Sequence, residues 1–272
     1  MKIASAQIAC TLGDVAANVE KIRKFSVQAK AAGAELLVFP EMTDTGYSMA
    51  VIQTAATPWA DGAVRDIRAI AKELSIAIVC GVSERDGPSI YNAQVCIDAT
   101  GEIAAKYRKT HLFAPAPIEE HKCFTAGGEF ATFAVGALRF GLTICYDLRF
   151  PEMYRQLAVE EAVNVFILSS AWPFPRVEHF RILAAARAIE NQSYVVVANR
   201  VGTDDGVTFC GSSALIDPSG VVVASASADC EELLIADVSE ETVRLVRDGM
   251  PVFSHRREEL YHPMSDANGS VA

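Results

Sequence analysis

The sequence of 272 residues lacks several features by which common classes of protein are recognised. No two cysteines have C-x-x-C spacing, which excludes a zinc ribbon and a thioredoxin-like motif. No apolar run reaches the roughly 18 residues of a membrane-spanning helix. Neither a P-loop nor a Gly-x-Gly-x-x-Gly motif occurs, and Gly211-Ser212-Ser213-Ala214 lacks the second glycine of a Gly-x-Ser-x-Gly turn. A serine nucleophile on such a turn is therefore not expected.

Basic residues are also scarce. Lys and Arg number 24 against 34 Asp and Glu, which gives a formal net charge of −10. An acidic surface argues against nucleic acid as a partner, and no basic amphipathic stretch suggests binding to a membrane. The histidines lack the spacing of metal ligands. We therefore expect no metal and no other cofactor.

The seven cysteines are odd in number and widely spaced, and Cys80 and Cys96 lie inside apolar runs. A thiol in such a run behaves as a small core residue. This pattern favours a reducing, cytoplasmic environment. The stretch Met1–Cys10 is too short and too interrupted by polar residues for a signal peptide, so we expect a first β-strand there.

Strand and helix patterns alternate along the chain without a low-complexity linker. Hydrophobic residues make up 51% of it, which is ample for a large core. We predict an α/β protein with mixed sheets and outer helices, in a single domain over 1–265 with a frayed tail over 266–272. The predicted strands are Lys2–Ala9, Glu35–Phe39, Ile76–Val82, Tyr91–Asp98, Ile103–Lys109, Leu138–Ile144, Val163–Leu168, Tyr194–Ala198, Ser212–Ile216, Val221–Ala224 and Leu233–Ala236. The predicted helices are Val15–Ala32, Ala63–Leu74, Pro151–Glu161, Val177–Glu190 and Glu240–Asp248.

The segment Leu142–Glu152 is the most informative part of the chain. The apolar run Leu138–Ile144 ends at Cys145, and polar residues, a proline and a helical pattern follow at once. This order predicts a nucleophile on a sharp strand-to-helix turn. Backbone N–H groups at such a turn have no intrahelical partner and are free to face a developing negative charge. If Cys145 is a nucleophile, other segments must supply a base and a charge stabiliser.

A candidate base follows the apolar strand Glu35–Phe39, which ends at Pro40-Glu41. Open α/β sheets build their sites at the C-terminal ends of strands. A carboxylate beside apolar walls has a raised pKa, which suits a general base. A helix cap or a surface glutamate is the alternative reading of Glu41.

A candidate charge stabiliser lies near the end of the strand Ile103–Lys109. Alternation places Tyr107, Lys109 and His111 on one face. A buried ammonium needs a partner, and Glu41 is available for that role. An edge strand with its charges in water is the alternative. We expect His111 to be hydrogen-bonded within the core or beside the site rather than to act in a Cys–His protease.

Three motifs around these residues are specific in combination. They read Phe39-Pro40-Glu41, Tyr107-Arg108-Lys109-x-His111-Leu112 and Ile144-Cys145-Tyr146-Asp147-Leu148-Arg149-Phe150-Pro151-Glu152. In order and spacing they resemble the signature blocks of the nitrilase superfamily of carbon–nitrogen hydrolases, and weaker similarity extends over nearly the whole chain. The resemblance implies a four-layer α-β-β-α sandwich with two mixed β-sheets.

The resemblance also implies a catalytic triad of Glu41, Lys109 and Cys145. Glu41 would take the Cys145 proton, and the thiolate would attack the carbonyl carbon of an amide. Lys109 and the backbone N–H of Tyr146 would stabilise the oxyanion. Ammonia would leave a thioester, which water activated by Glu41 would hydrolyse. The Lys109 ammonium is further expected to lower the pKa of the Cys145 thiol.

A second glutamate is implied on the loop before Thr125-Ala126-Gly127. Glu120 aligns best with it, and Glu119 is the adjacent alternative. Its expected role is to orient Lys109 or the substrate nitrogen.

The expected substrate-binding residues are Tyr47, Tyr146, Trp172 and Arg149. Tyr47 follows the Glu41 strand closely, and Trp172 follows the strand Val163–Leu168. A core aromatic under a loop is the alternative reading of Trp172.

The sequence does not show an obvious pair of basic residues that would bind a substrate carboxylate. Arg149 and Arg176 are the nearest candidates to bind a carboxylate, although Arg149 could instead pair with Asp147 or Glu152.

The segment Ala171-Trp172-Pro173, with Arg176 and His179, resembles the ω-amidase-like branch. That branch hydrolyses small carboxamides, often those of α-keto acids, so a small amide and water are the expected partners. An N-carbamoyl amidase or a nitrilase with the same triad is the alternative. A catalytically silent binding or scaffold protein is a third possibility, against which the intact triad argues.

Family members pair through helical faces near the nucleophile's helix. The resemblance therefore implies a homodimer or a larger homo-oligomer. The helices Pro151–Glu161 and Val177–Glu190 are the expected contact surface, and Met250–His262 is expected to cross to the partner.

Overall fold

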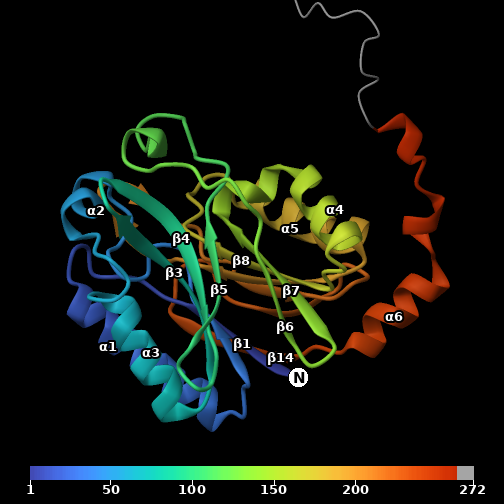
Figure 1. The fold of residues 1–272 in the computed structure, drawn as a ribbon, viewed down its shortest axis with the longest axis horizontal. Helices are drawn as coiled ribbons and strands as arrows, with labels where there is room; N and C mark the ends of the chain where they lie inside the picture. The colour runs from blue at the N-terminus through green and yellow to red at the C-terminus, as the bar shows by residue number, and fades with distance from the viewer. Residues whose placement is uncertain (262–272) are drawn as a thin grey trace, which may run out of the picture.

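Two six-stranded sheets form the centre of the structure, a computed structural model that describes residues 1–261 (Figure 1). The first sheet has the order β14-β1-β2-β3-β4-β5 and the second the order β13-β12-β9-β8-β7-β6. The strands of the first are β1 (Lys2–Gln7), β2 (Leu36–Val38), β3 (Ala77–Asp86), β4 (Ser89–Ile97), β5 (Ile103–Arg108) and β14 (Glu232–Asp237). Those of the second are β6 (Thr132–Val135), β7 (Leu138–Ile144), β8 (Val165–Ser170), β9 (Tyr194–Asn199), β12 (Ala214–Ile216) and β13 (Val222–Ser225). A separate two-stranded ribbon joins β10 (Thr203–Asp204) to β11 (Val207–Thr208).

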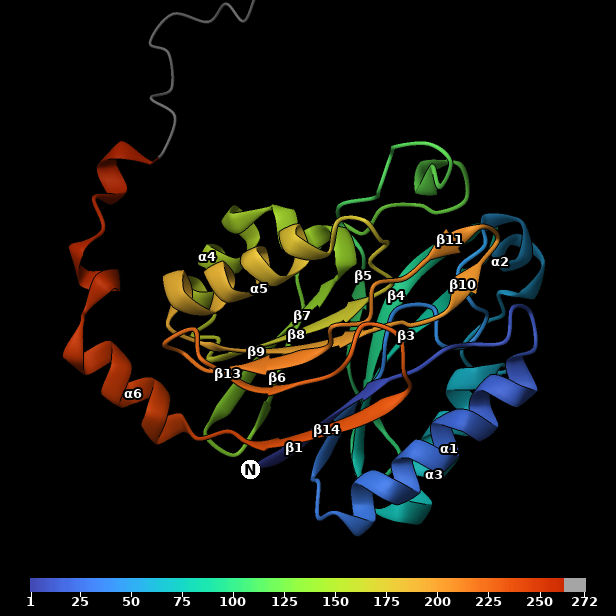
Figure 2. The ribbon, with the colours of Figure 1, turned by 180° about the vertical axis from the view of Figure 1, so that it is seen from behind.

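Helices cover the outer face of each sheet (Figure 2). α1 (Val15–Ala31) and α3 (Ala63–Leu74) lie on the first sheet, and α4 (Pro151–Glu160) and α5 (Val177–Asn191) lie on the second. The remaining helices are α2 (Met49–Ala55), α6 (Glu240–Gly249) and the 3-10 turns η1 (Glu120–Lys122), η2 (Cys145–Arg149), η3 (Val252–His255) and η4 (Glu258–Leu260). The layers follow the order helix, sheet, sheet, helix, so the predicted four-layer α-β-β-α sandwich with two mixed sheets is confirmed.

The apolar strands lie where both faces of a sheet are covered. β1, β2 and β3 are parallel neighbours in the first sheet, and β7, β8 and β9 are parallel neighbours in the second. Every residue of β2, β8 and β9 is buried. Parallel strands covered on both faces read as continuous apolar runs, which is why the sequence pattern locates them well.

Several elements differ from the predicted ones. β3 continues to Asp86, beyond the predicted end at Val82, because its charged outer half pairs with β4 in a long hairpin. β8 is displaced toward Ser170 relative to the predicted Val163–Leu168. Helix α2 and strands β6, β10 and β11 were not predicted, since each is seven residues or shorter and gives little periodic signal.

Some predictions fall on residues outside the described range. The domain boundary at residue 265, the frayed tail over 266–272 and the contribution of His262 to a dimer all lie beyond residue 261. Within residues 1–261, no helix combines the length and the apolar character needed to cross a membrane.

The fold brings four strand ends to one edge of the sandwich. β3 runs parallel to β2 and antiparallel to β4. Since β4 is in turn antiparallel to β5, β2 and β5 run in the same direction. Glu41 follows β2 and Lys109 follows β5 in the first sheet, while Cys145 follows β7 in the second. Ala171 follows β8, and its backbone N–H donates to Glu41, so the two sheets meet at this edge.

Candidate active site

Cys145 lies on the sharp turn that the sequence predicts. β7 ends at Ile144, Cys145 has a left-handed backbone with φ 45°, and α4 begins at Pro151. A residue other than glycine rarely adopts this conformation, so the surroundings must hold it. Asp147 does so through Oδ2, which accepts hydrogen bonds from the Ile144 N–H (2.9 Å) and the Tyr107 hydroxyl (2.8 Å).

His111 belongs to the same support. Its Nδ1 lies 2.9 Å from Asp147 Oδ1, and its ring stacks on Phe150 at a centroid distance of 3.9 Å. His111 thus has the hydrogen-bonded position beside the site that the sequence predicts.

Glu41 is fully buried and both of its carboxylate oxygens are occupied. Oε1 accepts from Lys109 Nζ (2.9 Å) and Asn92 Nδ2 (2.6 Å), and Oε2 accepts from the Ala171 N–H (2.8 Å). Burial raises the pKa of the Glu41 carboxyl, although the Lys109 ammonium opposes this shift. The raised pKa suits a general base.

Gly81 on β3 allows the Glu41 segment to approach the sheet. A Cβ atom at this position would lie 2.4 Å from the Pro40 carbonyl oxygen and 2.6 Å from Glu41 Cα. The glycine is therefore part of what places the carboxylate.

Lys109 is fully buried between two glutamates. Its Nζ donates to Glu41 Oε1 and to Glu120 Oε1, both at 2.9 Å, and its backbone N–H donates to the Asn92 carbonyl. Burial alone would disfavour the ammonium, but the carboxylates of Glu120 and Glu41 outweigh it and raise the pKa of Lys109. Lys109 is a fixed positive charge.

The structure distinguishes Glu120 from Glu119. Glu120 is fully buried, and its Oε1 accepts from Lys109 and from the Tyr47 hydroxyl (2.8 Å), while its Oε2 accepts from the Phe113 N–H (2.6 Å). Glu119 instead pairs with Lys122 at the surface, at 2.8 Å. Glu120 therefore holds the position beside Lys109.

The pKa of the Cys145 thiol differs from expectation. We expected the Lys109 ammonium to lower it, but burial and the charge of Glu41 outweigh that effect and raise the pKa of Cys145 well above its ordinary value. The sequence could not show this balance, because the desolvation of the thiol depends on the packing around it. The raised pKa favours the thiol over the thiolate, so this sulfur would need a base in order to act as a nucleophile.

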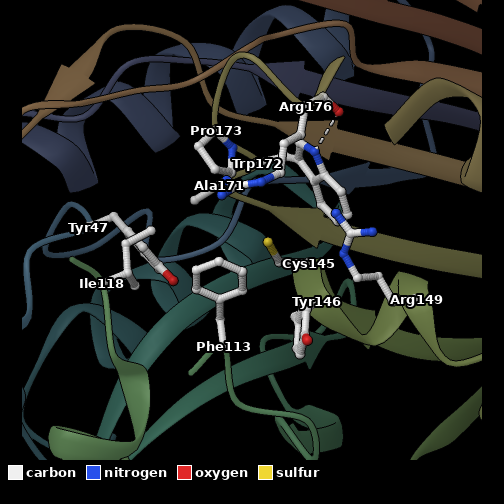
Figure 3. A pocket seen from close by; sticks show the side chains of 10 residues that line it. All are labelled: Tyr47, Phe113, Ile118, Cys145, Tyr146, Arg149, Ala171, Trp172, Pro173 and Arg176. Atoms are coloured by element: carbon white, nitrogen blue, oxygen red, sulfur yellow. Dashed lines mark hydrogen bonds between the residues drawn. The ribbon is translucent and has the colours of Figure 1, made fainter. Parts of the chain in front are cut away.

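The four predicted substrate-binding residues line one pocket around the Cys145 sulfur (Figure 3). The cavity offers about 20 Å³ to the centres of water-sized molecules, and about 320 Å³ when all space between the lining atoms and the open mouth is counted. The pocket therefore suits a small ligand. Its lining consists of Tyr47, Phe113, Ile118, Cys145, Tyr146, Arg149, Ala171, Trp172, Pro173 and Arg176.

Two of these residues have additional contacts that refine their roles. Tyr47 lines the pocket with its ring, but its hydroxyl is engaged with Glu120. Arg149 lies over the Trp172 ring, 4.8 Å from its centroid, and 3.4 Å from His179 Nδ1. The alternative pairing of Arg149 with Asp147 or Glu152 is absent among the ion pairs of residues 1–261.

Asn92 belongs to the site but was not predicted from the sequence. Its Nδ2 donates to Glu41 Oε1 and to Glu120 Oε1 (3.0 Å), so one amide joins both carboxylates. A signal was present, because Asn92 and Gln94 are polar residues two apart on a buried strand. Buried polar side chains two apart share a face and require partners.

The arrangement is suited to nucleophilic acyl substitution. The buried Cys145 thiol lines one small pocket, and the Glu41 carboxylate and the Lys109 ammonium, which are buried behind it, are near enough to influence its pKa. The first backbone N–H groups of η2 follow the thiol directly, where a tetrahedral oxyanion would form.

Comparison with known proteins gives consistent matches. The family model "Carbon-nitrogen hydrolase" matches residues 2–248. The chain is 34% identical to the 2-oxoglutaramate amidase of Bacillus subtilis over 95% of this chain and 98% of that protein. It is 30% identical to an omega-amidase of Homo sapiens over 90% of this chain and 91% of that protein.

A solved structure resembles the fold closely. It is a variant of the amidase from Nesterenkonia sp. AN1 in which the acetamide moiety of fluoroacetamide is covalently attached to the active-site cysteine. The TM-score is 0.85 and the identity 28%, over 96% of this chain and 95% of that chain.

Proposed function

Because this chain belongs to the carbon–nitrogen hydrolase family, we propose that its Cys145 pocket hydrolyses the terminal amide of a small ω-amide. The products are ammonia and the carboxylic acid. The observation that carries the proposal is the buried Lys109 ammonium held between the buried Glu41 and Glu120 carboxylates. Burying three charged groups costs desolvation free energy, and clusters of buried charges are found mainly at functional sites.

In the first half-reaction, the proton of the Cys145 thiol passes to Glu41 as the sulfur attacks the amide carbon. Lys109 and the Tyr146 N–H receive the oxyanion. Glu41 then gives its proton to the amide nitrogen, the carbon–nitrogen bond breaks and ammonia leaves. The acyl group remains as a thioester on Cys145.

In the second half-reaction, a water molecule occupies the place of the ammonia. Glu41 takes a proton from this water, whose oxygen attacks the thioester carbon. The carbon–sulfur bond breaks, the acid leaves and Cys145 regains its proton from Glu41. Glu120 holds Lys109 in register throughout, through the bond at 2.9 Å.

We also propose a homodimer formed through the outer faces of α4 and α5. Ile182 and Ile189 on α5 are 64% and 54% exposed, which is high for isoleucine in a protein of this size. The chain after α6 carries further exposed apolar side chains at Met250, Leu260 and Tyr261. A second copy would cover both. The cytoplasm remains the proposed location, which the seven free thiols suit.

Ammonia release from a panel of amides tests the proposed reaction. The panel contains α-ketoglutaramate, glutaramate, propionamide, an N-carbamoyl amino acid and an aromatic nitrile, each with wild type and the Cys145→Ala variant. We expect turnover of the ω-amides by the wild type and a loss of at least about 10³-fold in the variant.

Two other results would change either the proposed substrate or the proposed nucleophile. Turnover confined to the carbamoyl compound or the nitrile would keep the thioester chemistry and change the substrate. Equal ammonia release by both proteins would remove Cys145 as the nucleophile and overturn the mechanism.

A further inference from the structure

The ribbon of β10 and β11 adjoins the pocket but has no part in the mechanism proposed above. It lies next to α2, which begins shortly after Tyr47 (Figure 2). Asp204 on β10 is buried, and so is Arg200, which precedes the ribbon. Buried charged groups need partners, and the partners of these two connect the ribbon to the charges beside Cys145. The role inferred here for Asp204 rests on the proposed amide hydrolysis.

Arg200 and Asp204 form a buried ion pair. Arg200 Nη1 lies 2.6 Å from Asp204 Oδ2, and the guanidinium carbon lies 4.7 Å from the centroid of the Phe209 ring. A planar guanidinium can pair with a carboxylate through its edge while its face packs on an aromatic ring. The Asp204 carboxylate is therefore held from the side of the ribbon.

The same carboxylate oxygen holds Tyr47 from a distant part of the chain. The Tyr47 backbone N–H donates to Asp204 Oδ2 at 2.7 Å. Gly46 permits this approach, since a Cβ atom there would lie 3.1 Å from that oxygen. The Tyr47 ring also meets Phe209 edge to face, with centroids 6.1 Å apart. The ribbon thus fixes both the backbone and the ring of Tyr47.

Tyr47 in turn helps to place the charges of the site. Its hydroxyl donates to Glu120 Oε1 at 2.8 Å, and the same oxygen accepts from Lys109 Nζ at 2.9 Å. A shift of Tyr47 would therefore shift the oxygen that holds the ammonium. Misplacing a catalytic group by about 1 Å can cost about 100-fold in rate.

The ribbon is anchored to the opposite wall of the pocket, so it offers Tyr47 a fixed support. Phe209 forms an antiparallel bridge with Pro173, and the Cys210 N–H donates to the Trp172 carbonyl at 3.0 Å. Pro173 and Trp172 both line the pocket after β8. One short ribbon therefore joins the wall that carries Trp172 to the wall that carries Tyr47.

We propose that Asp204, held by Arg200, is a positioning residue for Lys109. It fixes the Tyr47 backbone so that the Tyr47 hydroxyl keeps Glu120 against the ammonium. Asp204 takes no part in bond breaking, and its effect on the rate passes through the Tyr47 hydroxyl. An ion pair that only supported the fold would matter equally with and without that hydroxyl.

A double-mutant cycle tests this dependence. We measure kcat and KM on the best ω-amide of the panel for wild type, Asp204→Asn, Tyr47→Phe and the double variant. Asp204→Asn should lower kcat about 10-fold in the wild type, but at most about 2-fold when Tyr47→Phe has already removed the hydroxyl. No loss, or equal losses in both backgrounds, would overturn the inference.

The adjacent carboxylate supplies the matched control. Asp205 is exposed on the same ribbon, and its Oδ2 accepts from the Ser48 hydroxyl at 2.9 Å rather than from Tyr47. Asp205→Asn should keep the wild-type kcat. A loss equal to that of Asp204→Asn would overturn the inference, because it would assign the effect to the ribbon's charge in general.

A second variant guards against loss of the fold, because Asp204→Asn leaves the buried Arg200 without its carboxylate. Arg200→Lys keeps a cation beside Asp204 and removes only the stacked guanidinium. It should lower kcat about 3-fold, again only where the Tyr47 hydroxyl is present. Urea unfolding shows which variants are folded. A folded Arg200→Lys protein with no loss, or with the same loss in both backgrounds, would overturn the inference.

Alkylation of Cys145 by iodoacetamide separates this inference from the proposed reaction, because it needs no turnover. Peptide mapping distinguishes Cys145 from the exposed Cys230. The Lys109 ammonium favours the thiolate, so Asp204→Asn should slow alkylation about 3-fold, and only where the Tyr47 hydroxyl is present. Such slowing without amide turnover by the wild type would retain the positioning role and reject the reaction. Turnover by the wild type, with kcat and alkylation both independent of the hydroxyl, would do the reverse.

Discussion

At the scale of single residues, the chemistry depends on how a few buried charges share their hydrogen bonds. Glu41, Lys109 and Glu120 are all fully buried, so each is stabilised by the others rather than by water. Removing one member of such a group costs more than the pair contributes, because a charge is left without a partner. The polar side chain that completes the group is Asn92, which donates to both carboxylates.

The pH dependence of Asn92→Ala tests this arrangement. The hydrogen bond from Asn92 lowers the pKa of Glu41, against the larger effect of burial, which raises it. Its loss should raise the pKa of Glu41 further, and the general base must be deprotonated to act. We expect the acidic limb of the kcat/KM–pH profile to move to higher pH, with about a 10-fold loss at neutral pH.

The control for this prediction is Gln94→Ala on the same strand. Gln94 is also buried, but it donates to Ser169 Oγ rather than to the glutamates. Its removal should leave the acidic limb in place. If the acidic limb also keeps its pH midpoint in Asn92→Ala, that midpoint does not reflect the pKa of Glu41.

At the scale of elements, the site depends on close approaches that glycine permits. The loop after η1 returns along β5, and the Gly127 N–H donates to the Lys109 carbonyl at 2.9 Å. A Cβ atom at Gly127 would lie 2.1 Å from the Arg108 carbonyl oxygen, which is backbone and cannot turn aside. The loop thus contacts the residue that precedes Lys109.

Alanine at two adjacent glycines tests this contact. Gly127→Ala should lower the free energy of unfolding by about 1–3 kcal/mol through overpacking. It should also lower kcat/KM at least about 10-fold, because a shift of β5 moves the Lys109 ammonium. Gly128→Ala is the control, since a Cβ there meets no atom within 4 Å. Urea unfolding and ammonia release measure the two effects.

These results can contradict the link between loop and site. A Gly127→Ala protein that loses stability but keeps its kcat/KM would show that the loop supports the fold without placing Lys109. Similar effects from both alanines would point to the flexibility of the loop instead.

At the scale of the whole molecule, one outer layer carries apolar side chains that its own fold does not cover. α5 exposes Ile182 and Ile189, and the chain after α6 extends along the side of the sandwich (Figures 1 and 2). Phe253 in this extension packs under Arg155 and Arg247, whose Cζ atoms lie 5.2 and 5.0 Å from its centroid. A second copy against this layer would bury these groups.

Light scattering coupled to size exclusion tests the dimer. The wild type should have at least twice the 29.2 kDa mass of one chain. Ile182→Asp combined with Ile189→Asp should shift the mass toward the monomer, because charges at the centre of an apolar interface disfavour association. Val27→Asp, on α1 at the opposite face and 48% exposed, should not. A monomeric wild type at micromolar concentration would reject this interface.

Much of this protein could be predicted from its sequence, for identifiable physical reasons. The parallel strands are covered on both faces and appear as apolar runs, and β7 and α3 have the predicted bounds. Glu41 and Cys145 each follow the end of such a strand, and the direction of these strands brings them to one edge. Lys109 instead follows β5, a largely exposed edge strand that is antiparallel to β4, so its burial could not be read from an apolar run. The family and the four-layer fold are confirmed, while the catalytic roles of these residues remain predictions.

What the tertiary structure decided depends on contacts between distant segments. Glu119 and Glu120 are neighbours in sequence, and the conformation of one loop buries the second beside Lys109 and leaves the first near the surface. Asn92 enters the site because β4 pairs with β5, which no local pattern states. The raised pKa of Cys145 and the position of Arg149 and Arg176 in its pocket likewise arise from burial and neighbours, which exist only once the two sheets have met.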